Sequence, residues 1–218
     1  MSLINRVHYW FHRPERGFDP VPYEYALSYF NRPNESEEYV RYEVDQVEQF
    51  CGSLKGKKIL DLGAGPGHFC KEFFFRGAQV TWHDISKNYY DLFIEKYGAV
   101  TNINTQIGYL EESSGKFDII FNRVCFYYAM NDKRLAHHII ALLNKHGQAY
   151  LILNNERQYL GKQDFVSKII TFLNNHFGLK IGHPMMNNKR IKKIFSNLPV
   201  NYITFEIKGA ETIVKLRK

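Results

Sequence analysis

The chain has few cysteines and no long apolar run. Its 218 residues include only Cys51, Cys70 and Cys125, which are far apart and odd in number. This pattern argues against a disulfide framework and is typical of a reducing cytoplasm. No apolar run approaches the ~18 residues that can span a bilayer, and residues 1–10 lack the apolar core of a secretion signal. We therefore expect a cytoplasmic protein with no membrane partner.

Metal-ligand spacing is also lacking. His137 and His138 adjoin one another, but no carboxylate or cysteine lies at a ligand's spacing from them. The sequence therefore predicts no metal site.

Positive charge is concentrated at the C-terminal end. Residues 180–218 hold nine Lys and Arg against two Glu, a net charge of +7 that equals the charge of the whole chain. Residues 1–179 are therefore neutral overall. A basic end can attract nucleic acid or anionic substrates, and it can also be a solvated surface. We favour the solvated surface, so a nucleic-acid partner is the less favoured alternative.

A glycine-rich turn lies at the centre of the chain. The apolar run 59–62 predicts a buried parallel strand, and Gly63, Gly65 and Gly67 follow at every second position. Aromatic residues then recur at helical spacing over 69–74. Glycine permits positive φ and lets a ligand approach the main chain closely. Strand, glycine turn and helix together predict a nucleotide-binding arrangement.

Two acids indicate what kind of nucleotide ligand the turn binds. The third glycine comes one residue earlier than in a dinucleotide fingerprint, and Asp61 precedes the turn. A carboxylate there would repel pyrophosphate and attract a cationic ligand. Asp84 lies 21 residues after Gly63, about where an acid binds ribose hydroxyls. The pattern favours an adenosine-containing ligand without phosphates.

Residues 61–67 resemble the first motif of the class I, seven-stranded, Rossmann-like S-adenosylmethionine-dependent methyltransferases. Asp84 matches the ribose-binding acid of that family, and residues 117–122 and 147–153 resemble its fourth and fifth strands. The resemblance implies a doubly wound, mostly parallel α/β sheet of seven strands, with helices on both faces and an antiparallel C-terminal hairpin. It also implies S-adenosylmethionine as cofactor and S-adenosylhomocysteine as product.

The resemblance carries a set of site residues with it. Tyr109 stands where the family usually has an acid for the adenine amino group, so the backbone of Tyr109 and Leu110, or the Glu111 carboxylate, is expected to serve. The predicted cofactor contacts are Tyr29, Asp61, Gly63, Ala64, Gly65, Gly67, Asp84, Ile85, Tyr109, Leu110, Asn122 and Arg123.

Tyr127 and Tyr128 follow the fourth strand, and ligands bind outside the carboxyl ends of strands in open parallel sheets. They are the predicted catalytic residues, which would position the methyl acceptor. A general base is needed only if the acceptor must lose a proton. The other candidates for that role are His8, His12, His68 and His183.

The sequence divides into two parts. Residues 1–34 are rich in aromatic side chains and interrupted by prolines, which predicts a flap over the ligand site. Residues 35–218 are expected to form a single Rossmann-like methyltransferase domain.

Three functions remain open. The first is methyl transfer to a hydroxyl or amine of a small molecule, and the second is methylation of RNA or protein, favoured by the basic end. The third is S-adenosylmethionine binding without turnover, favoured by the replaced acid at Tyr109. The mostly aromatic, neutral residues expected around the methyl group favour the first.

Overall fold

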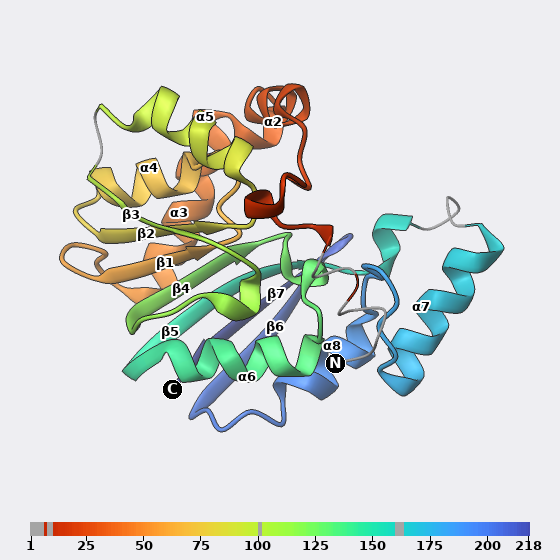
Figure 1. The fold of residues 1–218 in the computed structure, drawn as a ribbon. Helices are drawn as coiled ribbons and strands as arrows, with labels where there is room; N and C mark the ends of the chain where they lie inside the picture. The colour runs from red at the N-terminus through yellow and green to blue at the C-terminus, as the bar shows by residue number, and fades with distance from the viewer. Residues whose placement is uncertain (1–6, 8–10, 100–101, 160–163) are drawn as a thin grey trace.

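The computed structural model describes residues 7, 11–99, 102–159 and 164–218, and their core is a seven-stranded sheet with the order β3-β2-β1-β4-β5-β7-β6 (Figure 1). The strands are β1 (Lys58–Leu62), β2 (Gln79–Asp84), β3 (Asn104–Ile107), β4 (Phe117–Arg123), β5 (Leu143–Asn154), β6 (Tyr202–Lys208) and β7 (Glu211–Arg217).

The first five strands run parallel, and β7 is antiparallel to both β5 and β6. The strand order reverses beside β1, which has β2 on one side and β4 on the other. Ligands of doubly wound sheets bind at such a reversal, outside the carboxyl ends of the strands. The fold class predicted from the sequence, including the antiparallel C-terminal hairpin, is confirmed.

Helices cover both faces of the sheet (Figure 1). One core lies under α2, α3, α4 and α5 and contains the sheet residues Ile59, Trp82 and Phe121. The other contains Leu60 and Ile120 and packs against α6 and α8. Adjacent strand residues thus enter opposite cores, as the period of two requires. The helices are α2 (Tyr23–Phe30), α3 (Glu37–Cys51), α4 (His68–Phe75), α5 (Lys87–Tyr97), α6 (Asp132–Leu142), α7 (Phe165–Phe177) and α8 (Asn188–Phe195).

Two element boundaries are set by local structure. Helix α3 begins at Glu37, because Ser36 is its N-cap and accepts a hydrogen bond from the Tyr39 N–H. Residues 33–35 form a separate 3-10 turn. The fifth strand begins at Leu143, directly after α6, and contains a register shift opposite Phe117 and Ile119.

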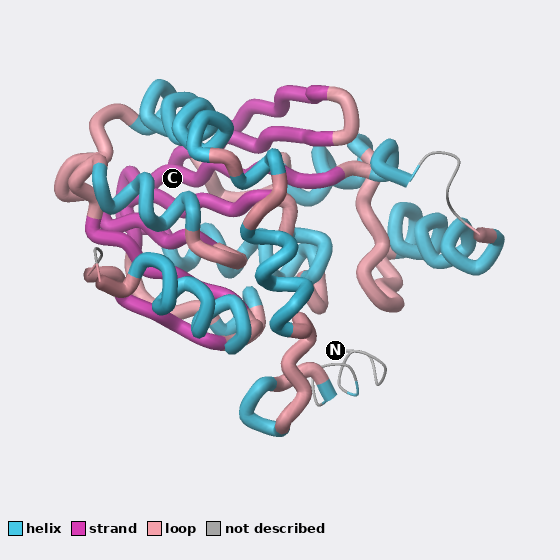
Figure 2. Tube along the Cα trace, turned by 90° about the horizontal axis from the view of Figure 1, so that it is seen from above, coloured by secondary structure: helices cyan, strands magenta, loops and turns pink. Residues whose placement is uncertain are grey.

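Helix α7 stands apart from the sheet in both views (Figure 1, Figure 2). Its N-cap Asp164 accepts a hydrogen bond from the Ser167 N–H, and Gly178 ends it in the left-handed conformation. Within the described residues no helix is long and apolar enough to cross a membrane.

Candidate active site

The glycine turn is held against the end of β2 by backbone hydrogen bonds. The N–H groups of Gly63 and Ala64 both donate to the His83 carbonyl, at 2.8 and 2.9 Å. The buried Trp82 indole donates to the Gly65 carbonyl at 2.9 Å. The sequence folds this way because β2 is parallel to β1 and ends beside it. The turn is therefore a rigid edge of the cavity that opens above it.

Two of the three glycines are required by close packing. A Cβ at Gly67 would lie 2.2 Å from the Phe93 ring, and one at Gly63 would lie 2.7 Å from the Cys125 Cβ. All three glycines have positive φ, which L side chains rarely adopt. At Gly65, in contrast, no atom lies within 4 Å of the place where a Cβ would stand. That open space belongs to a cavity of about 590 Å³ lined by the turn.

Asp61 and Asp84 are two buried acids of this cavity. The Asp84 carboxylate accepts hydrogen bonds from the Gly65 N–H at 2.9 Å and the Ser86 N–H at 3.0 Å. The Asp61 carboxylate accepts one from the Cys70 thiol at 3.2 Å. Burial raises the pKa of Asp61 to about 7 and that of Asp84 to about 6. Neither carboxylate pairs with a Lys or Arg of the described residues.

These carboxylates fit the cofactor that the sequence predicts. A carboxylate oxygen can accept two hydrogen bonds, so both groups keep capacity for a ligand. A cationic ligand beside Asp61 would supply the charge partner that the described residues do not provide. Ribose hydroxyls beside Asp84 would use its remaining capacity. The two carboxylates and the open space at Gly65 therefore suit a cationic, adenosine-containing molecule.

A buried ion pair forms part of the cavity wall. The Arg123 guanidinium, at the end of β4, donates to the Glu35 carboxylate at 2.9 Å, and both side chains are under a tenth exposed. The rings of Tyr39 and Phe69 lie 4.9 and 5.4 Å from the guanidinium carbon. Burial raises the pKa of Glu35, and the Arg123 charge opposes that shift. The sequence prediction included Arg123 but missed Glu35, whose only signal was its place in an acidic run.

Val124 and Cys125 continue the wall after β4. Val124 has a φ of 49°, a strained value for a β-branched residue, and its N–H donates to the Ile152 carbonyl at 2.7 Å. The Cys125 thiol lies against the Gly63 carbonyl at 3.4 Å. Nothing in the sequence signals the backbone conformation of Val124, so the sequence prediction did not include Val124 and Cys125 among the site residues.

Tyr127, Tyr128 and His183 form an aromatic group in the cavity wall. The two tyrosine rings are 4.2 Å apart, and the rings of Tyr128 and His183 are 5.0 Å apart. The tyrosines belong to a 3-10 turn after β4, and His183 lies between α7 and α8. The predicted catalytic residues Tyr127 and Tyr128 and the candidate base His183 thus lie together in the cavity wall.

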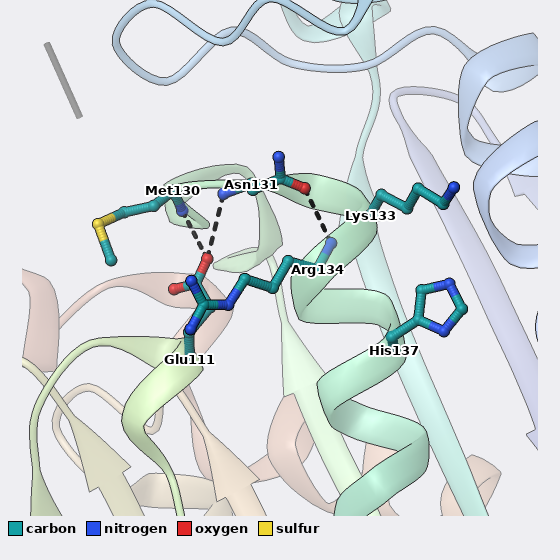
Figure 3. Close-up of a pocket in the computed structure, with 6 residues that line it drawn as sticks. All are labelled: Glu111, Met130, Asn131, Lys133, Arg134 and His137. Carbon is teal, nitrogen blue, oxygen red and sulfur yellow. Dashed lines mark hydrogen bonds between the residues drawn. The ribbon is translucent and has the colours of Figure 1, made fainter. Parts of the chain in front are cut away.

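Tyr109 and Leu110 line the cavity, as expected for the adenine side. Glu111 does not. Its carboxylate accepts hydrogen bonds from the N–H groups of Met130 at 2.7 Å and Asn131 at 3.2 Å, in a separate hollow at the start of α6 (Figure 3). The suggestion that Glu111 takes the role of the missing acid is therefore wrong.

Most of the predicted cofactor residues line the cavity, and two do not. Gly67 is the N-cap of α4, and its missing Cβ makes room for Phe93. Asn122 is fully buried, and its amide donates to the Leu62 carbonyl, which ties β4 to β1. Those that line it are Tyr29, Asp61, Gly63, Ala64, Gly65, Asp84, Ile85, Tyr109, Leu110 and Arg123.

The histidines considered as general bases also divide into those that line the cavity and those that do not. His12 and His183 line the cavity. The His68 ring instead makes hydrogen bonds to the Phe30 carbonyl at 3.0 Å and the Tyr97 hydroxyl at 2.6 Å, and burial lowers its pKa to about 4. His68 therefore supports the fold. His8 lies outside the described residues.

Comparison with known proteins gives the family. A family model described as a methyltransferase domain matches residues 36–198. A curated relative, malonyl-[acyl-carrier protein] O-methyltransferase 1 of Ilyobacter polytropus, is 26% identical over 134 residues, which are 59% of this chain and 50% of the relative. The chain thus spans about half the length of the curated relative that it matches.

Solved structures share the fold. Magnesium protoporphyrin IX methyltransferase from Synechocystis PCC 6803, crystallised with S-adenosylmethionine, aligns with a TM-score of 0.60 and 16% identity, over 84% of this chain and 80% of the other. The CurJ carbon methyltransferase aligns with a TM-score of 0.65 and 16% identity, over 90% and 58%. With the family model covering most of the chain, this protein belongs to the class I S-adenosylmethionine-dependent methyltransferases.

Proposed function

We propose that this chain transfers a methyl group from S-adenosylmethionine to a hydroxyl or amine of a small molecule. The observation that carries the proposal is the cavity itself. Its volume of about 590 Å³ lies within the usual range for small-molecule sites, and it must hold both the cofactor and the acceptor. The aromatic group of Tyr127, Tyr128 and His183 suits a compact, partly apolar acceptor.

The cofactor, when bound, supplies an activated methyl group on a cationic sulfur. Asp61 contributes negative charge to that cation, and Asp84 accepts hydrogen bonds from the ribose hydroxyls. Ala64, Gly65 and Ile85 give the cofactor a close backbone surface, and Tyr109 and Leu110 flank the adenine. Orienting the two reactants and excluding water can lower such a barrier by on the order of 7–11 kcal/mol.

On the acceptor side, Tyr127 and Tyr128 position the nucleophile. If the nucleophile must lose a proton, His12 and His183 are the histidines of the described wall that can receive it. An amine acceptor in its neutral form needs no such step.

The experiment is a methyl-transfer assay with radiolabelled S-adenosylmethionine and three acceptor pools: a metabolite extract, total RNA and a protein extract. Incorporation into the metabolite pool, lost in Tyr127→Ala with cofactor affinity retained, is the expected result. The basic C-terminal region favours the second candidate, RNA or protein methylation, and incorporation confined to those pools would establish it instead. Cofactor binding without transfer to any pool would leave a non-catalytic binding protein.

In the same proposal, the N-terminal aromatic segment of residues 1–34 is a flap on the domain formed by residues 35–218. Its described part contributes Tyr25, Tyr29 and Arg32 to the cavity wall. The Arg32 guanidinium lies over the Tyr29 ring, 4.5 Å from its centroid. Asp19 fastens the segment to the start of α5, where its carboxylate accepts hydrogen bonds from the Ser86 hydroxyl at 2.7 Å and the Asn88 N–H at 2.9 Å.

Asp19→Ala is therefore expected to loosen the flap. Losing hydrogen bonds to a carboxylate should weaken S-adenosylhomocysteine binding about tenfold and speed tryptic cleavage after Arg16. Calorimetry and timed digestion measure the two effects, while the melting temperature of the domain should change little. Glu24→Ala, an exposed acid in the neighbouring α2, is the matched control and should leave both values unchanged. Unchanged affinity and cleavage in Asp19→Ala would argue against a flap.

A further inference from the structure

Helix α7 turns its apolar side to solvent. Its buried residues are Thr171 and Asn174, which face the body of the protein. Phe165, Phe172 and Phe177 are 76%, 53% and 68% exposed. Val166 and Ile169 on the same helix and Leu179 just after it are exposed as well. A surface helix normally buries its apolar stripe, so this inversion indicates that something else covers α7.

The surroundings of α7 are strongly basic. Residues 156–193 contain eight Lys and Arg against two acids, and the buried Asp132 of α6 pairs with Lys180 and Arg190, which leaves a local net charge of +5. Helix α8 follows closely, since the Asn187 N–H donates to the Asn175 side chain of α7 at 2.9 Å. It exposes Lys189, Lys192 and Lys193. The partner of α7 should therefore be apolar and negatively charged.

The shape of α7 discriminates between partners. The helix projects from the rest of the backbone in both views (Figure 1, Figure 2). A protein partner would need a matching apolar trough, whereas a lipid surface accepts any apolar ridge at its headgroup boundary. A second copy of this chain would bring two regions of +5 together, which charge repulsion opposes.

We propose that α7 is an interfacial helix that docks this protein on an anionic lipid surface. Its phenylalanines enter the headgroup boundary, and the lysines of α8 and Lys168 bind the lipid charge. The expectation of no membrane partner rested on the lack of a spanning segment and of a secretion signal, and an interfacial helix needs neither. Residues on both sides of α7 in the sequence line the cavity: Gln158 precedes the helix and His183 follows it.

The test is sedimentation of the full chain with lipid vesicles. Vesicles of phosphatidylcholine with phosphatidylglycerol should carry the protein down, and vesicles of phosphatidylcholine alone should bind it far more weakly. Raising the salt from about 0.1 M to about 1 M should weaken binding to the anionic vesicles, because it shortens the screening length.

Variants then place the contact on α7. Phe165→Ser combined with Phe172→Ser should weaken vesicle binding by at least about tenfold, because two exposed rings no longer enter the lipid. Both residues are exposed, and S-adenosylhomocysteine affinity should stay unchanged as evidence of folding. Phe75→Ser, at an exposed phenylalanine of α4 on the opposite side of the molecule, is the matched control (Figure 1).

Three results would overturn the proposal. The first is no binding to anionic vesicles, or binding that the α7 variant leaves unchanged. The second is a dimer in sedimentation analysis that the α7 variant abolishes, which would assign α7 to a second copy. The third is α7-dependent binding to a purified acyl-carrier protein, an acidic soluble probe, without vesicle binding.

Discussion

Glu35→Ala is expected to lower the free energy of unfolding by about 3–5 kcal/mol. The substitution removes the partner of the buried Arg123 guanidinium and leaves its charge uncompensated. The flanking rings of Tyr39 and Phe69 attract the guanidinium, and the Tyr39 side chain hydrogen-bonds to it, but neither supplies a compensating negative charge. Urea denaturation followed by circular dichroism measures the change, with the slope of the transition expected to stay constant.

Glu37→Ala is the matched control. Glu37 is two residues away and pairs with Lys71 at 2.9 Å, but its side chain is 67% exposed. Exposed ion pairs contribute little, so the denaturation midpoint should hardly move. Equal effects of the two substitutions would show that burial of the Glu35–Arg123 pair does not matter. Glu35→Gln, which keeps a hydrogen-bond acceptor, should lie between wild type and Glu35→Ala.

Asp84→Ala is expected to weaken S-adenosylmethionine binding by about 1.5–3 kcal/mol, or roughly 10- to 150-fold. Two causes act together. The substitution removes the acceptor for the ribose hydroxyls, and it frees the Gly65 and Ser86 N–H groups that hold the glycine turn. Titration calorimetry with S-adenosylmethionine and S-adenosylhomocysteine measures the loss, which should be similar for both because they share the ribose.

The control for Asp84 is Asp91→Ala. Asp91 is a half-exposed carboxylate of α5 that pairs with Lys87 on the surface. Its loss should leave cofactor affinity unchanged. Wild-type affinity in Asp84→Ala would remove this residue from the site, and the ribose would then have to be bound by other groups. Asp84→Asn separates the two causes, because an amide oxygen can still hold one N–H of the turn.

The sequence determined the centre of the site because its signals there are local. Positive φ demands glycine at Gly63, Gly65 and Gly67 wherever this turn occurs, and the acids are set by their place at the ends of two strands. The apolar run of β1 indicated a strand that is buried on both faces of the sheet. These patterns carried the family resemblance, which implied the fold, the cofactor and ten of the residues that line the cavity.

Only the tertiary structure decided the contacts between distant residues. Glu35 and Arg123 are separated by 88 residues, and nothing local brings them together. Glu111 was one of two alternatives for binding the adenine amino group, and instead it accepts two N–H groups at the start of α6, because that helix packs beside it. The periodicity of α7 shows an apolar face but not its direction. Because Thr171 and Asn174 are the buried side chains of α7, packing alone turned its phenylalanines to solvent.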